Sequence, residues 1–217
     1  MSARIIAIAQ QKGGAGKTTL AAQLAVAWST AGERIALLDV DPQGSLAAWY
    51  KIRCEIMGQK AGGLVFSDIS GWRLGNEIDK MKRECDLIII DTPPHAETDA
   101  RVAVRAAELI LIPIQPSPMD LWAIGPTLEM ARKEKAEALV VMNRMPARGK
   151  LTDTVVGKLK DEKIPVAKST LGSRVAYAAS MLEGKGVFEL SPRPASAVAE
   201  IAALAAEVMA RLKKKQK

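Results

Sequence analysis

The chain of 217 residues has few aromatic side chains and two cysteines. Aromatic residues make up 4% of the sequence, so the core must be built mainly from Ala, Leu, Ile and Val. Cys54 and Cys85 form no C-x-x-C pair and have no histidine nearby, which argues against a zinc site and a disulfide framework. No apolar run approaches the roughly 18 residues of a membrane span, and the run at the N-terminus is too short for a signal peptide. These absences predict a cytoplasmic protein.

Length and charge describe an ordinary globular chain with a basic excess. The 48% hydrophobic and 25% charged content matches globular averages, and 217 residues favour one domain. We expect a single domain over residues 1–212, followed by a disordered basic tail over residues 213–217. Lys and Arg number 31 against 24 Asp and Glu, which gives a formal net charge of +7. This excess suggests an anionic partner, such as nucleic acid, a nucleotide or acidic lipid, without choosing among them.

Short apolar runs alternate with longer segments of helical periodicity along the whole chain. This order is typical of βα units wound into a mostly parallel sheet, and continuous runs such as Leu87–Ile90 suit strands buried on both faces. We predict an α/β fold, with a doubly wound, mostly parallel sheet of about seven strands and helices on both faces. The predicted strands are 5–9, 35–40, 64–66, 87–91, 109–114, 139–143 and 164–168. The predicted helices are 17–30, 45–57, 72–83, 98–107, 121–135, 151–161, 174–182 and 195–212.

The strongest functional signal is the segment QKGGAGKTT, between the first predicted strand and the first predicted helix. A phosphate loop requires that context, because glycines let the backbone wrap phosphate oxygens and the helix N-terminus supplies donors. Lys17 can reach the β- and γ-phosphates, and the Thr18 hydroxyl can bind Mg²⁺, as in a P-loop NTPase domain. Gln11 replaces the first glycine of the common pattern, and a second lysine, Lys12, follows it. The predicted nucleotide-binding residues here are Gly13, Gly14, Ala15, Gly16, Lys17, Thr18 and Thr19.

Three aspartates stand at the ends of two predicted buried strands, in the segments LLDVDPQ and LIIIDTPP. Ligands of a doubly wound sheet bind at the carboxyl ends of its strands, so these charges are expected to face the phosphate loop. Asp91 fits a direct or indirect role in binding Mg²⁺, and Asp39 could hold a Mg²⁺-bound water. Together with Thr18 they form the predicted metal site. Asp41 lies past its strand end, where it could orient the water that attacks the γ-phosphate.

At these motifs the sequence resembles the ParA/MinD family of deviant Walker ATPases, and most of all the short, ParF-like partition ATPases. The resemblance spans nearly the whole chain. Its specific motifs are KGGAGKTT at residues 12–19, DVDPQGS at 39–45 and IIDTPP at 89–94. Two weaker matches are IPIQPSPMD at 112–120, which resembles the proline-rich segment of ParF-like proteins, and VMNR at 141–144.

The resemblance implies an ATPase that hydrolyses ATP slowly with Mg²⁺ and forms a homodimer when ATP binds. In such a dimer Lys12 crosses to the partner's phosphates, as an arginine finger does in other NTPases. The implied catalytic residues are Lys12, Lys17 and Asp41. A ParB-like or adaptor partner protein would accelerate hydrolysis, and the ATPase would partition or position DNA or another intracellular cargo. No N-terminal operator-binding domain is expected.

Asn143 and the proline-rich segment admit two readings each. Asn143 sits at a strand end where its amide could pair with adenine, or it could simply form a turn. Pro116 and Pro118 could contact the dimer partner or respond to nucleotide, or they could make a stiff connection after the fifth strand. Asp120 could pair with Lys12 at the dimer interface, or it could cap the helix that follows.

Family members act on two different anionic surfaces. ParA-like proteins bind DNA without sequence preference in the ATP state, whereas MinD-like proteins insert a C-terminal amphipathic helix into the membrane. The terminal helix of this chain is rich in alanine and carries Glu200 and Glu207, so we read it as packed on the sheet and expect no stable membrane association. We therefore favour a nucleoid-associated protein. Arg174 and Lys185 are candidate DNA contacts, because they lie in the C-terminal region that the resemblance associates with DNA binding.

Two other functions remain alternatives. One is a membrane-associated division-site ATPase of the MinD type. The other is a metal-cluster ATPase of the Mrp or nitrogenase-iron-protein type, which shares the phosphate loop but needs paired cysteines near the dimer face. Cys85 precedes its strand at the end away from the nucleotide and Cys54 lies late in a helix, so neither cysteine is well placed for a cluster.

Overall fold

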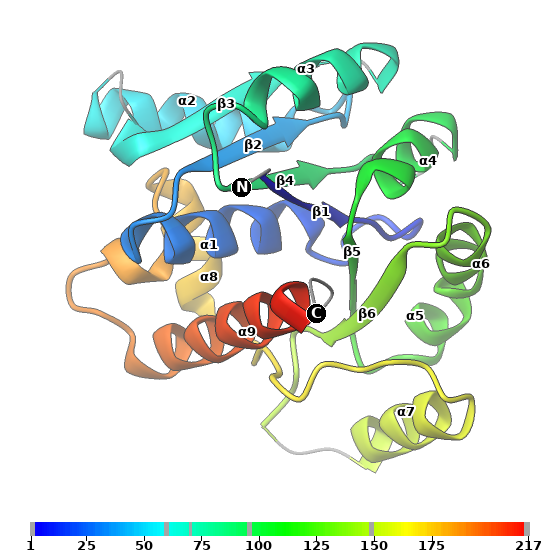
Figure 1. Ribbon diagram of the computed structural model, residues 1–217. Coiled ribbons are helices and arrows are strands. Elements are labelled where there is room, and N and C mark those ends of the chain that lie inside the picture. The colour runs from blue at the N-terminus through cyan, green and yellow to red at the C-terminus, as the bar shows by residue number, and fades with distance from the viewer. Residues whose placement is uncertain (1–2, 59–60, 70, 95–96, 148–149, 215–217) are drawn as a thin grey trace.

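The computed structural model (Figure 1) describes residues 3–58, 61–69, 71–94, 97–147 and 150–214. Its sheet has six parallel strands in the order β3-β2-β4-β1-β5-β6. Every residue of Leu87–Asp91 is buried, as a central strand covered on both faces requires. The strands are β1 (Arg4–Ile8), β2 (Ile35–Asp39), β3 (Leu64–Asp68), β4 (Leu87–Asp91), β5 (Leu109–Ile114) and β6 (Glu137–Met142).

Helices cover both faces of the sheet, as predicted (Figure 1). Successive strand side chains point to opposite faces, so Ile6 and Ile8 belong to one core and Ile5 and Ala7 to the other. One face packs against α1 (Lys17–Thr30), α2 (Ser45–Met57), α8 (Val175–Leu182), the short η3 (Val187–Glu189) and α9 (Ala195–Lys214). The other packs against α3 (Leu74–Met81), α4 (Glu97–Ala106), α5 (Pro118–Ala123), α6 (Gly125–Lys133) and α7 (Lys150–Asp161). Short 3-10 turns η1 (Ala61–Gly63) and η2 (Gly71–Arg73) flank β3.

The predicted seventh strand, residues 164–168, is wrong as a strand. The segment follows the outer edge of β6 but makes one isolated bridge there, between Val140 and Val166. Pro165 has no N–H to donate, which interrupts a regular ladder. Beyond it, the amides of Lys168 and Ser169 donate to Glu207 of α9 instead of to β6. The segment therefore ends the sheet as an irregular edge that α9 holds.

The predicted helix 121–135 is two helices, and it starts earlier than expected. Ser117 caps α5, because its Oγ accepts from the Asp120 N–H, and Pro118 occupies the first turn, where its missing N–H costs nothing. Pro118 is therefore helical and not part of an extended loop. Pro126 begins the next helix, α6, in the same way, which breaks the run after Ala123.

The C-terminal helix is longer than predicted. Helix α9 continues through Lys214, so the first two residues of the expected tail are helical, and residues 215–217 lie outside the described residues. Lysines at a helix C-terminus interact favourably with the helix dipole. Figure 1 shows α9 lying along α1, and the buried Ile201, Leu204 and Val208 fix it there. Among the described residues no helix is long and apolar enough to cross a membrane.

Candidate functional site

The phosphate loop joins β1 to the N-terminus of α1. Gly14 and Gly16 have φ values of 75° and 94°, in the left-handed region that side chains disfavour. Gly16 is required for a second reason, because a Cβ there would lie 2.5 Å from the Asn143 side-chain nitrogen. No side chain of the described residues caps α1, which starts at Lys17. Its first amides are therefore free to donate to an anion held by the loop.

The strand register brings the acidic side chains to the same edge. Asp39 of β2 and Asp91 of β4 are direct neighbours in the ladder, and Ile8 pairs with Asp91 on the other side, just before the loop. Thr18 Oγ1 donates to Asp91 Oδ2 at 2.6 Å. The buried Asp39 carboxylate accepts the amides of Asp41 and Ala47, so it also fixes the turn that carries Asp41. The three predicted metal-site residues, Thr18, Asp39 and Asp91, thus lie together.

The two buried carboxylates at this edge, Asp39 and Asp91, together favour the binding of a metal cation. Burial raises the pKa of Asp91 to about 7, with the neighbouring Asp39 adding to the effect, and burial likewise raises the pKa of Asp39 to about 6. Asp91 Oδ1 is buried and accepts no hydrogen bond in the described part of the chain. Mg²⁺ prefers carboxylate and hydroxyl oxygens together with phosphates and waters, so the residues present fit this metal.

The lysine of the loop lies between these acids and the phosphate side. Lys17 is 7% exposed, and burial lowers its pKa, although Asp91 and Asp41 oppose that change. A cavity opens in front of it, lined in part by the glycines of the loop. The cavity is lined by Gly13, Gly14, Gly16, Lys17, Thr18, Thr19, Asp41, Gln43, Ser45, Pro94, Arg144, Ala178, Met181 and Leu182. Asp41 is therefore placed beside the predicted phosphate position.

The second lysine does not line this cavity. Lys12 Nζ forms an ion pair with Asp120, whose carboxylate is fully buried and also accepts from the Gln115 amide and from Ser117 Oγ. Burial alone would raise the pKa of Asp120, but the hydrogen bonds from Lys12, Ser117 and Gln115 hold it below its usual value. Of the two readings of Asp120, the structure favours the pair with Lys12, within one chain, while Ser117 is the cap.

The proline-rich segment contacts the phosphate loop at a second point. Gln115 Nε2 donates to the carbonyl of Gly14 at 3.2 Å. With the Lys12–Asp120 pair, this contact ties the end of β5 to the loop from the side opposite Asp39. A dimer role for Pro116 and Pro118 stays a prediction.

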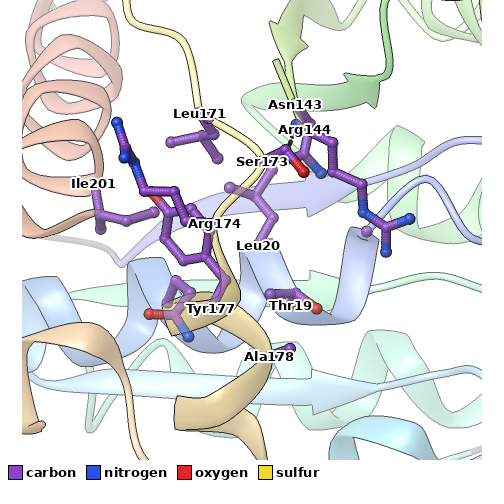
Figure 2. Close-up of a pocket in the computed structure, with 13 residues that line it drawn as sticks. Thr19, Leu20, Asn143, Arg144, Leu171, Ser173, Arg174, Tyr177, Ala178 and Ile201 are labelled. Atoms are coloured by element: carbon purple, nitrogen blue, oxygen red, sulfur yellow. Dashed lines mark hydrogen bonds between the residues drawn. The ribbon is translucent and has the colours of Figure 1, made fainter. Parts of the chain in front are cut away.

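A further cavity adjoins the phosphate side across Gly16 (Figure 2). Asn143 Nδ2 donates to the Ala15 carbonyl at 2.9 Å, and Asn143 Oδ1 accepts from the Arg144 amide. Asn143 thus anchors the loop to the end of β6, as a turn-forming residue would, and it also lines this cavity. Adenine recognition by Asn143 stays a prediction. The lining residues are Gly16, Thr19, Leu20, Gln23, Asn143, Arg144, Leu171, Gly172, Ser173, Arg174, Tyr177, Ala178 and Ile201.

Both candidate DNA contacts are ion-paired in this structure. Arg174 Nη2 lies 2.6 Å from Glu200 Oε1, and Lys185 Nζ lies 2.8 Å from Glu183 Oε2. Arg174 lines the cavity of Figure 2, and its side chain is 39% exposed. Among the described residues no hydrogen bond or ion pair joins the two side chains. Their role in DNA binding stays a prediction.

Sequence reasoning missed several residues of the site. Arg144 lines both cavities and has a φ of 50°, and Gln115 and Ser117 hold the loop and Asp120. Met181 lines the phosphate side from α8. Arg144 follows Asn143 directly, so its position after a strand end on the ligand edge could have marked it. Nothing local marks Met181, because α8 reaches the site through long-range packing.

Comparison with known proteins agrees with this geometry. The model of the "CobQ/CobB/MinD/ParA nucleotide binding domain" family matches residues 6–187. The "maintenance of carboxysome distribution protein A" of Halothiobacillus neapolitanus is 31% identical, over 94% of this chain and 95% of that protein. The "chromosome-partitioning ATPase Soj" of Thermus thermophilus is 30% identical, over 96% of each chain. The crystal structure of the Pyrococcus furiosus cell division ATPase MinD superposes with a TM-score of 0.77 at 21% identity, over 95% of this chain and 98% of that one.

The family match covers most of the chain and includes all three motifs on which the expected resemblance rests. The two relatives above align over nearly their whole length, and the MinD comparison supports the same fold independently. The expected family and the expected P-loop ATPase fold are confirmed, with six strands in place of seven. The chain therefore belongs to the CobQ/CobB/MinD/ParA nucleotide-binding family, and it is an ATPase of the ParA/MinD type.

Proposed function

We propose that this ATPase forms a homodimer when ATP binds, associates with DNA without sequence preference in that state, and positions DNA or another intracellular cargo. A ParB-like or adaptor protein would accelerate its hydrolysis. The observation that carries the proposal is Lys12, which stands at the phosphate loop but pairs with Asp120 outside its own phosphate cavity. The relatives named for carboxysome distribution and for chromosome partitioning support the cargo-positioning role.

The phosphate side divides the chemistry among five residues. Lys17 and the loop amides bind the β- and γ-phosphates, while Thr18 and Asp91 hold Mg²⁺ with Asp39 behind them. When bound, Mg²⁺ neutralises charge on the phosphate oxygens. Asp41 orients the attacking water, which needs position more than strong basicity, because phosphoryl transfer depends mainly on alignment and charge neutralisation. The Asp41 N–H donates a hydrogen bond to the Asp39 carboxylate, and this bond holds the Asp41 residue in place.

Lys12 completes the site of the opposite subunit. In the single chain its charge is used by Asp120, so its own ATP receives one lysine, Lys17. In a dimer, Lys12 exchanges Asp120 for the partner's phosphates, which carry more negative charge. The exchange leaves Asp120 with its bonds from Ser117 and Gln115, which limits the cost of losing the lysine. Dimerisation thus depends on the nucleotide.

The base enters the cavity beside Asn143. Its walls combine apolar side chains such as Leu20 and Ile201 with the Tyr177 ring and a few polar groups, which is the composition of a base-binding pocket. The cavity shares Gly16, Thr19, Arg144 and Ala178 with the phosphate side, so one nucleotide can occupy both. Asn143 offers an amide to the base edge from the position where it also anchors the loop.

DNA is the favoured surface because the chain carries a net charge of +7, and the described part of its terminal helix is rich in alanine and carries Glu200 and Glu207. Of the basic residues, Lys12 and Lys17 are assigned to nucleotide. Arg174 and Lys185 would contact DNA by exchanging a carboxylate for a phosphate, so each contributes modestly. Such binding would place the protein on the nucleoid. Its affinity for DNA would fall steeply as salt rises, by about 0.9 log units per phosphate contacted per log unit of salt.

The proposal is tested on the full chain with the Asp41→Ala variant, which retains bound ATP. Light scattering after size-exclusion chromatography should give a dimer with Mg-ATP and a monomer with ADP. Adding Lys12→Ala should return the protein to the monomer. Duplex DNA should co-sediment with the ATP form, whereas vesicles containing anionic lipid should not. ATP-dependent binding to vesicles without DNA binding would instead support the MinD-type alternative. For the metal-cluster alternative, the described part of the chain contains no group of three or more His, Cys, Asp or Glu side chains that could hold a metal ion.

A further inference from the structure

Helix α9 holds the irregular segment that forms one wall of the base-side cavity. The segment, residues 168–174, follows the expected seventh strand (164–168), and three of its amides turn to α9 and away from β6. Two glutamates on one face of α9 accept them. Glu207 accepts the amides of Lys168 and Ser169, each at 3.0 Å, and Glu200 accepts the amide of Gly172 at 3.0 Å.

Glu200 binds more than the backbone. Its carboxylate also accepts from Arg174 Nε at 2.9 Å, from Arg174 Nη2 at 2.6 Å and from the Tyr177 hydroxyl at 2.7 Å. The Tyr177 bond is partly buried, because Tyr177 is 8% exposed and the Glu200 side chain 19%, whereas the two Arg174 bonds are exposed. A charge-assisted bond is stronger than a neutral one, and two arginine nitrogens bound to the same Glu200 oxygen also fix geometry.

The fit around Glu200 is close. A Cβ on Gly172 would lie 3.1 Å from Glu200 Oε1 and 3.2 Å from Arg174 Nε. The glycine therefore lets the carboxylate approach the backbone. Burial would raise the pKa of Glu200, but the bonds from Arg174, Tyr177 and Gly172 hold it below its usual value, so the group stays ionised at neutral pH.

The partners of Glu200 are themselves the cavity wall. Gly172, Arg174 and Tyr177 all line the cavity beside Asn143, whereas Lys168 and Ser169, the partners of Glu207, do not. Figure 2 shows Leu171, Arg174 and Tyr177 on one side of this cavity, with Asn143 and Arg144 on the other. One carboxylate of α9 thus fixes three groups of a wall that no regular strand supports.

We propose that Glu200 is a positioning residue for the nucleotide base. By fixing Gly172, Arg174 and Tyr177, it gives the cavity the shape that binds the base, and so sets the base-dependent part of nucleotide affinity. This inference rests on the proposed function, because it requires the base to occupy that cavity. Arg174 then serves the nucleotide site first, and its guanidinium is committed to Glu200 before any contact with DNA.

The test separates the base from the phosphates. Calorimetry with Mg²⁺ measures the affinity of the full chain for ADP and for inorganic triphosphate, which lacks the base. Glu200→Gln keeps the shape of the side chain but places an amide NH₂ against groups that all donate. We expect it to weaken ADP binding about tenfold or more and to leave triphosphate binding unchanged. The matched control, Glu207→Gln on the same face of α9, should leave both affinities unchanged.

Two further variants keep each outcome decisive. Ser173→Trp fills the base-side cavity from a residue that does not line the phosphate cavity and does not bond Glu200, so it should weaken ADP but not triphosphate binding. If it does so while Glu200→Gln binds ADP normally, the positioning role is wrong and the base site is right. If neither variant changes ADP affinity, the proposed base site itself is wrong. An equal loss for ADP and triphosphate in Glu200→Gln would mean a general structural role and overturn the inference. Should Glu200→Gln not fold, Tyr177→Phe, which removes one donor, must show the same selective loss on a smaller scale.

Discussion

The two halves of the proposed nucleotide site are built in different ways. The phosphate half consists of a continuous loop and two strand ends, and its residues are fixed by local backbone and by the strand register, as the Asp39–Asp91 pairing shows. The base half has an irregular wall held from a distance by α9, through Glu200. Short sequence motifs therefore determine the phosphate half, whereas the base half depends on packing between segments far apart in the chain.

This difference has a functional consequence. The phosphate half combines charged groups whose pKa values are displaced by burial, such as Asp91 and Lys17, so it is poised for an ion and a phosphate. In the base half, polar side chains such as Arg174 already have hydrogen-bond partners, and other lining residues are apolar. Changes in the first half should affect binding and chemistry strongly, and changes in the second should affect selectivity.

The largest effect is expected for Lys17→Ala in the phosphate half. The substitution removes the loop's own cation and leaves Asp91 and Asp41 without it, so ATP affinity should fall by about 100-fold or more. Calorimetry with Mg-ATP measures the change, and circular dichroism checks that the fold persists. Tight ATP binding in a folded variant would show that the loop does not hold the phosphates.

Asp41→Ala should separate hydrolysis from binding. The residue lines the phosphate cavity, and among the described residues no hydrogen bond joins it to Thr18 or Lys17, so ATP affinity should stay within a few-fold. Hydrolysis should fall about 100-fold, the range expected when a positioned proton acceptor or water-orienting group is lost. Phosphate release at saturating ATP is the measurement. Turnover equal to that of the wild type would remove Asp41 from this role.

The pH dependence of stability without nucleotide should report the titration of the buried Asp91 carboxylate. Asp91 has an ordinary pKa of 3.8 and a folded-state pKa of about 7, so the folded protein binds its proton more tightly than the unfolded one. Stability without nucleotide should therefore fall as pH rises from about 4 to 7. Asp91→Asn should remove that loss. At pH 8 its free energy of unfolding, measured with urea, should exceed that of the wild type by on the order of 2 kcal/mol.

The same Asp91→Asn pair gives its own control. Near pH 4 the two proteins should differ little, because the wild-type Asp91 is then protonated in the fold. With Mg-ATP at pH 8 the wild type should become the more stable, since the carboxylate then meets its cation. A variant that is less stable than the wild type at every pH would contradict the assignment.

Sequence patterns located the glycine-rich loop and the strand-end aspartates, for a physical reason. A loop such as KGGAGKTT needs particular residues at particular backbone angles, and Gly14 and Gly16 adopt the left-handed values that only glycine takes easily. The apolar runs likewise located six strands, because a strand buried on both faces leaves a continuous signal.

The remaining features depend on contacts that no local pattern encodes. The segment 164–168 is as apolar as an edge strand, but Pro165 and the carboxylate of Glu207 decide against a ladder. Glu200 was read as evidence against a membrane helix, and its four hydrogen bonds could not be foreseen from spacing. The Lys12–Asp120 pair was one of two open readings, because it joins residues 108 positions apart.

The smallest effect is expected far from the phosphates, at Lys185. Its ammonium is paired with Glu183, so Lys185→Ala should weaken DNA binding of the ATP form only a few-fold, and equally for all sequences. The slope of log affinity against log salt should decrease by about 1 if Lys185 contacts one phosphate. Fluorescence anisotropy with a short duplex at several salt concentrations measures both. An unchanged slope would assign the DNA surface elsewhere.

The most direct test of the account is whether Lys12 acts on the nucleotide of its own chain or of its partner. Lys12→Ala and Asp41→Ala should each hydrolyse ATP poorly alone. In a mixed dimer, the Lys12→Ala subunit keeps its Asp41 and receives Lys12 from the other subunit, so mixing should raise phosphate release above the sum of the two variants. No gain on mixing, in a sample where light scattering shows mixed dimers, would contradict the account and place Lys12 in its own site.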